Sequence, residues 1–293
     1  MVALGMGLLT GLLNIMLASA IGIYSGSGSA QAVLWGCAFG FLGGFTSAVI
    51  ATGLVPIIEI LFEYTSDIKL LELANLDQPL MRKLMIEAPG TYQHSLAVSN
   101  LAEAGADAVA ANSLLVRVCA YYHDVGKLVK PEYFVENQRH GNPHDGLTAS
   151  MSALVIQSHV KEGLALAQAA RLPLAIWQGI ATHHGTKLIR YFYTKALERA
   201  DRDKSEVRES DYRYPGPKPT SREETILMLA DSIEAACKSL KNPTEKELND
   251  FVNKIIAGKI TQGQLQSSKL SFSELEECTE VFKKVMKSIH HVR

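Results

Sequence analysis

Two residues that can bind metal or carry protons stand side by side within an apolar segment. In "AYYHDVGKLV" (120–129), His123 precedes Asp124, and Lys127 follows about one helical turn later. The apolar character of the segment predicts a buried helix that presents all three side chains on one face. A buried charge is costly unless it is paired or holds a metal ion. These residues therefore require partners from elsewhere in the chain.

Four other apolar segments also contain imidazoles or a carboxylate. They contribute His94, His159, the pair His183–His184, and Asp231. A single histidine on an apolar helix face is usually a satisfied core residue. Five separate segments that each bury such a group are better explained if the groups converge on metal, because coordination offsets the cost of burial.

The candidate ligands are imidazoles and carboxylates without sulfur, a donor set that suits iron, manganese or zinc. Seven candidates exceed the needs of one ion and fit two ions bridged by a carboxylate. The four cysteines are far apart and form no CxxC pair. This spacing indicates a reducing compartment and argues against disulfides and a thiolate zinc site.

Charge is distributed very unevenly along the 293 residues. The net charge is −1, which gives no indication of a DNA or RNA polymer as partner, and residues 1–58 contain no Asp, Glu, Lys, Arg or His. Two apolar runs, about 2–23 and 33–58, are each long enough for the ~20 residues of a membrane helix. A signal peptide would need a basic start and one short apolar run, and the sequence has neither. A soluble hairpin would show a polar face, and none is visible.

We therefore expect residues 1–64 to form a membrane hairpin of two transmembrane helices in contact with the lipid bilayer. The glycines of "GFLGG" (40–44) favour close helix packing there. Basic residues follow the second run and are absent from the connecting turn. By the positive-inside rule, the N-terminus and residues 65–293 are expected in the cytoplasm.

Residues 65–293 are predicted to be all-α. Helical periodicity recurs, and N-terminal capping pairs occur at Ser221–Glu224, Thr244–Glu247 and Ser271–Glu274. No stretch shows the sustained period-2 alternation with β-branched residues that is typical of a strand. Gly/Pro-rich breaks fall at 88–91, 140–146 and 214–219, and the charged run 198–213 is expected to be solvated.

The ordered pattern H…HD…H…HH…D resembles the two-metal branch of the HD-domain phosphohydrolases. Its surroundings are similar to the cytoplasmic domain of seven-transmembrane HD proteins, in the motifs "IEAPGTYQHS", "YYHDVGKL", "NPHD", "SHVKEG", "HHGT" and "RYPGPKP". Compared with that family, the chain lacks the sensor domain and the first five membrane helices, so we expect a fragment or truncated form. It also has "HHGTKLIRYFY" in place of the "HHExxDGxGYP" motif of relatives that hydrolyse cyclic di-GMP.

The resemblance implies a phosphodiesterase of the bacterial inner (plasma) membrane that opens cyclic di-AMP to linear pApA. Its cofactors would be two divalent ions, manganese or iron, which generate a hydroxide nucleophile from water near neutral pH. The resemblance assigns His94, His123, Asp124 and Asp231 to one ion. It assigns His159, His183 and His184 to the other, with Asp124 as the catalytic bridge.

Lys127 is expected to neutralise a substrate phosphate, the alternative being a surface lysine whose head group is solvated. Tyr214 in "YPGPKP" either flanks the nucleotide or belongs to a stiff turn. The second HD dipeptide, His144–Asp145, is expected in a loop outside the ligand set, and His290–His291 in a solvated tail.

Alternative functions remain open at this point. They are hydrolysis of cyclic di-GMP or a guanosine alarmone, and an inactive HD domain that binds the messenger and signals through partners. A homodimer is compatible with the sequence.

Overall fold

The structure is a computed structural model that describes residues 2–24, 29–62, 64–139, 141–203, 206–241 and 243–289. His290 and His291, for which a solvated tail was predicted, lie outside these residues. The chain divides into two units, Met1–Ser66 and Asp67–Arg293, which are described separately below. Within the described residues both units are helical, and their only β feature is an isolated antiparallel bridge between Leu188 and Arg213.

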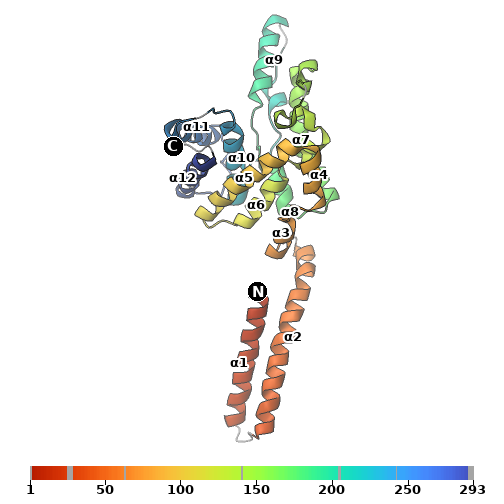
Figure 1. The fold of residues 1–293 in the computed structure, drawn as a ribbon, viewed down its shortest axis with the longest axis vertical. Coiled ribbons are helices and arrows are strands. Elements are labelled where there is room, and N and C mark those ends of the chain that lie inside the picture. The colour runs from red at the N-terminus through yellow and green to blue at the C-terminus, as the bar shows by residue number, and fades with distance from the viewer. Residues whose placement is uncertain are drawn as a thin grey trace. The chain divides into compact units, whose positions relative to one another are not determined.

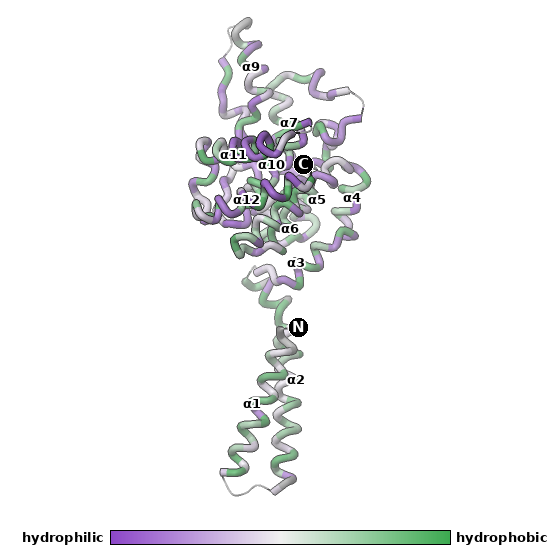
Figure 2. Tube along the Cα trace, turned by 60° about the vertical axis from the view of Figure 1, so that its left-hand side comes forward, coloured by the Kyte–Doolittle hydropathy of each residue, from purple (hydrophilic) through white to green (hydrophobic). Residues whose placement is uncertain are grey.

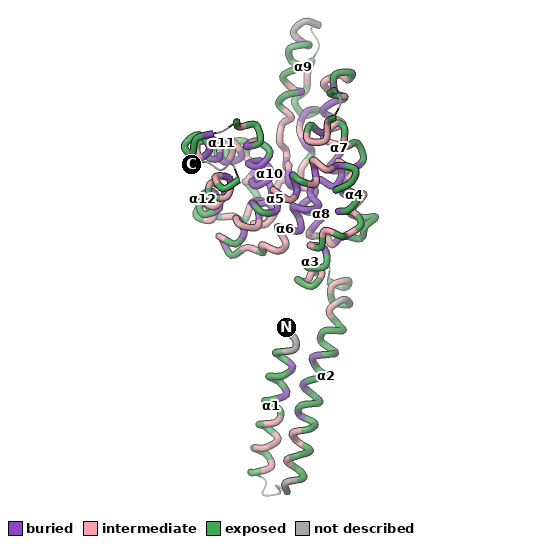
Figure 3. The backbone as a smooth tube through the Cα atoms, in the orientation of Figure 1, coloured by how far each residue is buried: buried purple, intermediate pink, exposed green. Residues whose placement is uncertain are grey.

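The first unit consists of two long helices, α1 (Val2–Tyr24) and α2 (Ala30–Phe62). Both are apolar along most of their length (Figure 2) and expose most of their side chains (Figure 3). A soluble protein rarely exposes so much contiguous apolar surface. The spans 5–24 and 31–59 have the length and composition of membrane-crossing helices.

Small residues let α1 and α2 approach closely. A Cβ on Gly44 would lie 2.5 Å from the carbonyl oxygen of Gly7 and 2.7 Å from the Cα of Gly11. A Cβ on Gly40 would lie 3.1 Å from the backbone nitrogen of Ile15 in α1. Two glycines of the "GFLGG" stretch therefore lie in the helix contact, as small residues do in membrane helix pairs.

The second unit contains ten α-helices and five short 3-10 helices in the described residues (Figure 1). The α-helices are α3 (Asp67–Leu73), α4 (Pro79–Glu87), α5 (Pro89–Ala108), α6 (Ser113–Tyr122), α7 (Ala149–Ala169), α8 (Leu174–Thr182), α9 (Arg190–Asp203), α10 (Arg222–Cys237), α11 (Glu245–Thr261) and α12 (Phe272–Ile289). The 3-10 helices are η1 (Val125–Val129), η2 (Pro131–Tyr133), η3 (Val135–Asn137), η4 (Pro143–Gly146) and η5 (Glu209–Tyr212).

The core of this unit is built around α5 and α10. Helix α5 packs against α6, α10 and α12, and α10 is buried over almost its whole length (Figure 3). Leu101, Ile226 and Phe282 are completely buried where these helices meet. A smaller cluster around Phe192 and Tyr212 joins α7, α9 and η5. The large core therefore holds the helices that carry the candidate ligands.

The predicted capping pairs mark helix starts. Thr244 and Glu247 form a reciprocal capping box at α11, and Ser271 and Glu274 exchange the same two bonds before α12. At α10 the box is only half formed. Ser221 accepts from the backbone N–H of Glu224, but the Glu224 carboxylate accepts from the backbone N–H of Thr220 instead.

The prediction of one continuous helix through the HD pair is wrong. Helix α6 ends at Tyr122, His123 follows it, and Asp124 adopts a non-helical conformation (φ −105°, ψ 12°) before the 3-10 helix η1. The apolar periodicity continues across this break because η1 buries Val125 and Leu128 in the same core. Periodicity alone could not reveal the change of backbone.

Candidate metal centre

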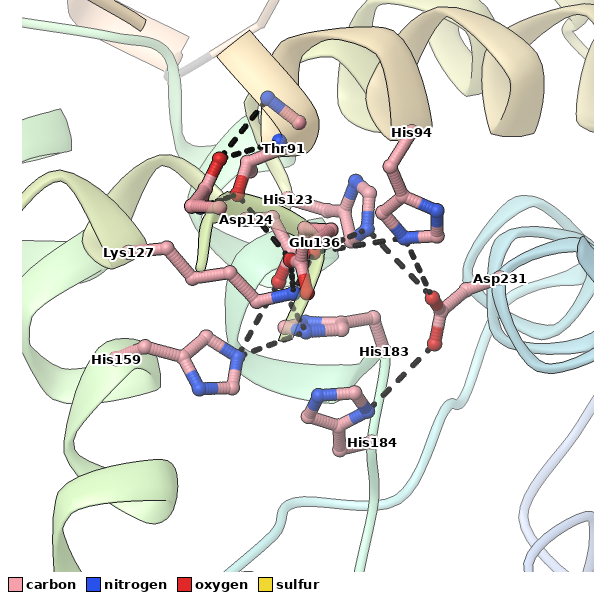
Figure 4. A network of polar contacts seen from close by, with 12 residues as sticks. Thr91, His94, His123, Asp124, Lys127, Glu136, His159, His183, His184 and Asp231 are labelled. Atoms are coloured by element: carbon pink, nitrogen blue, oxygen red, sulfur yellow. Dashed lines mark hydrogen bonds and ion pairs between the residues drawn. The ribbon is translucent and has the colours of Figure 1, made fainter. Parts of the chain in front are cut away.

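All seven predicted ligand residues converge at one place in the second unit (Figure 4). His94 comes from α5, His123 and Asp124 from the turn after α6, His159 from α7, His183 and His184 from the turn after α8, and Asp231 from α10. Six of the seven are buried, and His184 is mostly buried. Each lies at a point where its helix meets the core.

The turn after α6 brings Asp124 to α7. A Cβ on Gly126 would lie 1.8 Å from the carbonyl oxygen of His159 and 2.4 Å from the backbone nitrogen of Gly163. Only glycine permits this backbone approach between η1 and α7. The glycine of "HDVGK" therefore places the Asp124 carboxylate beside His159.

The ligand atoms fall into two groups that have Asp124 in common. Its Oδ2 lies 3.5 Å from Nε2 of His94 and 3.3 Å from Nε2 of His123. Its Oδ1 lies 3.3 Å from Nε2 of His159 and 3.6 Å from Nε2 of His183. Each oxygen of the carboxylate thus faces a different pair of imidazoles.

Asp231 stands opposite Asp124 and also faces both groups. Its Oδ1 lies 3.1 Å from Nε2 of His94 and 3.8 Å from Nε2 of His123, and its Oδ2 lies 3.6 Å from Nδ1 of His184. The carboxylate therefore lies beside the His94–His123 group, with its second oxygen directed toward His184.

Backbone carbonyls set the orientation of three imidazoles. Nδ1 of His123, His159 and His183 lies 2.6–2.7 Å from the carbonyl oxygen three residues earlier in each case. A carbonyl only accepts, so each Nδ1 must carry the proton and donate it. The lone pair of each neutral ring is then on Nε2, which points into the site.

His94 is oriented by a side chain instead. Its Nδ1 lies 2.5 Å from Oε2 of Glu234, one turn beyond Asp231 on α10. A carboxylate–histidine pair of this kind is typical of metal sites, because it holds the ring and makes its other nitrogen a better donor.

The geometry fits metal ions better than it fits hydrogen bonds. Nε2 of His123, Oδ1 of Asp124 and Nδ1 of His184 are buried without a hydrogen-bond partner among the described residues. Such orphaned polar atoms are costly and need an explanation. Two donors ~2.1 Å from one ion lie ~3.0–3.4 Å apart at octahedral or tetrahedral angles. The separations within each group are close to this range, so both groups can hold a metal ion.

The electrostatics keep both carboxylates ionised. Burial alone would raise the pKa of Asp124, but Lys127 and His123 outweigh burial and hold this pKa well below its usual range. For Asp231, the neighbouring His123 and His94 outweigh burial and hold the pKa of this carboxyl well below its usual range too. Ionised carboxylates are the form that binds metal.

The imidazoles differ in their tendency to carry a proton. Burial lowers the pKa of His159 to about 3 and lowers that of His184 as well, so both rings are neutral donors near pH 7. For His123, burial is outweighed by Asp124 and Asp231, which raise the pKa to about 10. Without a metal ion, a proton on His123 balances the carboxylates, and coordination would displace it.

Lys127 is not the solvated surface lysine of the alternative interpretation. Its side chain is 12 % exposed, and its ammonium lies 2.7 Å from both Oδ2 of Asp124 and Oε1 of Glu136. The ammonium also lies 5.0 Å from the centre of the Phe134 ring. These carboxylates raise the pKa of Lys127 despite its burial, so it stays charged.

Tyr214 is buried against the site. Its ring lies 4.3 Å from that of His184 and 5.9 Å from that of His159, centre to centre. The backbone N–H of Tyr214 donates to the carbonyl of Lys187 and so ties the segment after η5 to the turn that carries His184.

The second HD dipeptide lies outside both ligand groups. His144 is buried in η4, with Nε2 3.0 Å from the carbonyl oxygen of Tyr133 and its ring against Phe192, whereas Asp145 is exposed. His144 therefore has a structural role between η2 and α9.

Sequence reasoning missed four residues around the site. They are Thr91, Glu136, Glu234 and Lys259. Glu234 had a usable signal, because it lies one helical turn after Asp231 in the apolar run "ILMLADSIEAA". Lys259, on α11, is buried with no hydrogen-bond partner for its ammonium among the described residues. Burial, with a smaller contribution from the positive charge of Lys187, lowers the pKa of Lys259 to about 7.

Two family descriptions match this chain. Residues 91–236 match the HD domain, and residues 3–66 match the 7TM receptor with intracellular HD hydrolase.

Individual relatives and a solved structure are also similar to this chain. The chain is 43% identical over 255 residues to the cyclic-di-AMP phosphodiesterase PgpH of Bacillus subtilis, covering 87% of this chain and 35% of the relative. It is 39% identical over 289 residues to PgpH of Listeria monocytogenes, covering 98% and 40%. The crystal structure of the L. monocytogenes PgpH HD domain in complex with cyclic-di-AMP matches with 42% identity and a TM-score of 0.70, over 74% of this chain and 99% of that one. The chain thus spans well under half the length of the two PgpH proteins.

The first prediction concerns metal content. The protein purified with manganese or iron should carry about two ions per chain. Asp124→Ala should lose both, because its two oxygens face both groups of imidazoles, and His184→Ala should mainly lose one. Elemental analysis against protein concentration measures this. Asp145→Ala, in the other HD dipeptide, should keep both ions. A full complement in Asp124→Ala would show that Asp124 does not serve both groups.

The second prediction concerns Lys259. Replacing it with Met should stabilise the protein at pH 7 by about 2 kcal/mol or more, because a buried, unpartnered ammonium is removed. The pKa of Lys259 falls from an ordinary 10.5 to about 7 on folding, so the unfolded state binds more protons between these pH values. Wild-type stability should therefore rise with pH across this window, and the advantage of Lys259→Met should shrink.

Thermal unfolding of the whole chain in detergent at pH 7 and pH 10 provides the measurement. The control is Lys254→Met at an exposed position of the same helix, which should change little at either pH. A loss of stability in Lys259→Met at pH 7 would mean that the amine has a partner.

Proposed function

The chain belongs to the family of seven-transmembrane receptors with an intracellular HD hydrolase domain, and we propose that it is a metal-dependent phosphodiesterase that opens cyclic di-AMP to linear pApA. The observation that carries the proposal is the pair of ligand groups joined by Asp124. Its substrate is inferred from the PgpH relatives, whose names state cyclic-di-AMP phosphodiesterase activity.

The ligand set suits two divalent transition ions, and manganese or iron fits a site of imidazoles and carboxylates without sulfur. His94, His123, Asp124 and Asp231 would hold one ion. His159, His183 and His184 would hold the other, with Asp124 common to both. When bound, such a pair of ions activates water and stabilises negative charge on the oxygens of a phosphodiester.

The protein residues perform the remaining tasks. The backbone carbonyls and Glu234 fix which imidazole nitrogens face the site, so little reorganisation is needed when the substrate binds. Asp124 and Asp231 supply negative charge at the centre. Lys127 remains protonated beside Asp124 and offers positive charge to a phosphate. Tyr214 covers His184 and shields this side of the site from water.

We place the catalytic unit in the cytoplasm of the bacterial cell. The apolar helices α1 and α2 would cross the inner membrane, and the sequence that connects them, residues 25–29, contains no charged residue. Lys69, Arg82 and Lys83 follow α2, and an excess of positive charge marks the cytoplasmic side.

The third prediction concerns catalysis. The full chain in detergent, loaded with manganese or iron, should convert cyclic di-AMP to pApA, measured by chromatography of the products. Asp124→Asn should lower kcat by roughly a thousandfold or more, because the effect falls on the reacting centre rather than on substrate binding alone. Circular dichroism checks that the helices persist.

Two comparisons make this experiment decisive. Asp145→Asn removes the same charge at the exposed position of the second HD dipeptide and should leave kcat unchanged. Cyclic di-GMP and a guanosine alarmone, tested beside cyclic di-AMP, identify the preferred substrate. Tight binding of cyclic di-AMP by the metal-loaded wild type without any linear product would favour a messenger-binding module instead.

The fourth prediction concerns topology. Expressed in bacteria, the chain should stay in the membrane pellet after alkaline carbonate extraction, since α1 and α2 are held by lipid. Trypsin added to intact spheroplasts should leave residues 67–293 uncut and should cleave them after lysis. A fragment of residues 67–293 serves as control and should be released by carbonate. Cleavage in intact spheroplasts would reverse the proposed orientation.

A further inference from the structure

The ammonium of Lys127 forms ion pairs with two carboxylates. It lies 2.7 Å from Oδ2 of Asp124 and 2.7 Å from Oε1 of Glu136. The face of the Phe134 ring lies against the ammonium. The Phe134 and His159 rings pack edge to face, with their centres 5.6 Å apart. An ammonium has three N–H groups, so two directed to carboxylates leave a third for another acceptor.

Glu136 has no place in the ligand set. It belongs to neither group of candidate metal ligands, and its recorded polar side-chain contacts are with Lys127 and the hydroxyl of Thr91. Its own pKa is held below the usual value by Lys127, which outweighs burial, so the carboxylate is ionised. A partly buried negative charge this close to Asp124 repels the Asp124 carboxylate, so its presence needs an explanation.

The position of Glu136 is fixed by the start of α5. The Thr91 hydroxyl donates to Oε1 of Glu136 at 3.2 Å and accepts from Nδ2 of Asn137 at 2.8 Å. Oδ1 of Asn137 accepts from the backbone N–H groups of Gly90 and Thr91. A Cβ on Gly90 would lie 1.9 Å from the carbonyl oxygen of Glu136, so only glycine allows η3 to approach this closely.

These contacts form a chain from the start of α5 through Thr91 and Glu136 to Lys127 (Figure 4). Without Glu136, the nearest recorded carboxylate for the ammonium is Asp124, whose Oδ2 also faces His94 and His123. The ammonium would then move toward Asp124 and away from the position that Glu136 and Phe134 define.

We infer that Glu136, held by Thr91, is a positioning residue that fixes the Lys127 ammonium where it can receive a phosphate of the substrate. The inference rests on the proposed phosphodiesterase function and extends it beyond the ligand set. Glu136 has no hydrogen bond or ion pair with a candidate metal ligand and, on this account, does not touch the substrate, so its effect on substrate binding passes through Lys127.

The test is a double-mutant cycle with Glu136→Gln and Lys127→Met in the full, metal-loaded chain. Gln keeps the shape of Glu136 and its contact with Thr91, and Met keeps the methylene stem of Lys127. Glu136→Gln should raise KM for cyclic di-AMP about three- to tenfold, with kcat changed less than about twofold and metal content unchanged. In the Lys127→Met background, Glu136→Gln should have no further effect.

Two variants separate positioning from simple structural support. Glu132→Gln removes a carboxylate from an exposed position of the same loop and should leave KM unchanged. Thr91→Val, which lacks the hydroxyl, should raise KM in the same direction as Glu136→Gln, and Thr91→Ser should restore it.

Three results would overturn the inference. They are an unchanged KM in Glu136→Gln, an equal rise of KM with and without Lys127, and a loss of metal from Glu136→Gln. The same four proteins of the cycle are also titrated with inorganic phosphate by calorimetry. If the wild type gives no linear product, the phosphodiesterase proposal fails, and the coupling between Glu136 and Lys127 is still read from the dissociation constants for phosphate.

Discussion

The Asp124 carboxylate lies within 3.6 Å of four imidazole nitrogens and 2.7 Å from an ammonium, and its exposed fraction is 1%. A buried carboxylate can stay ionised only where positive charge or hydrogen-bond donors surround it. This requirement explains why α6 ends one residue before the HD pair and why η1 lies against the backbone of α7. It also explains why α5, α8 and α10 each bring a polar side chain to this place in the core: His94, His183 and Asp231.

The ligand residues could be recognised from the sequence because each one interrupts an apolar segment. His94, His159 and Asp231 stand among residues that belong to the core, and burial without compensation would be too costly for all of them. The starts of the helices could also be predicted from the sequence, because the caps at Thr244 and Ser271 involve residues only three positions away. Local patterns therefore predicted the helices and the residues that face the core.

Features that depend on distant contacts could not be predicted in this way. Thr91 and Glu136 are 45 residues apart, and only the fold shows that they meet. The end of α6 at Tyr122 was missed because η1 continues the burial pattern of a helix with a different backbone. Lys259 gave no signal either, because the sequence "NKIIAGKIT" is compatible with an exposed lysine at the end of an amphipathic helix.

The way in which the imidazoles are oriented bears on how this site can change over evolution. His123, His159 and His183 are oriented by main-chain carbonyls, which remain whatever side chains replace Ala120, Ile156 and Ile180. His94 is oriented by the side chain of Glu234, which a single codon change can remove or replace. A substitution at Glu234 can therefore change directly how strongly His94 binds a metal ion. Substitutions at Ala120, Ile156 and Ile180 leave the carbonyls that orient the other three rings in place. Among homologues, variation in metal preference should accordingly be concentrated around His94 and the α10 face that it meets.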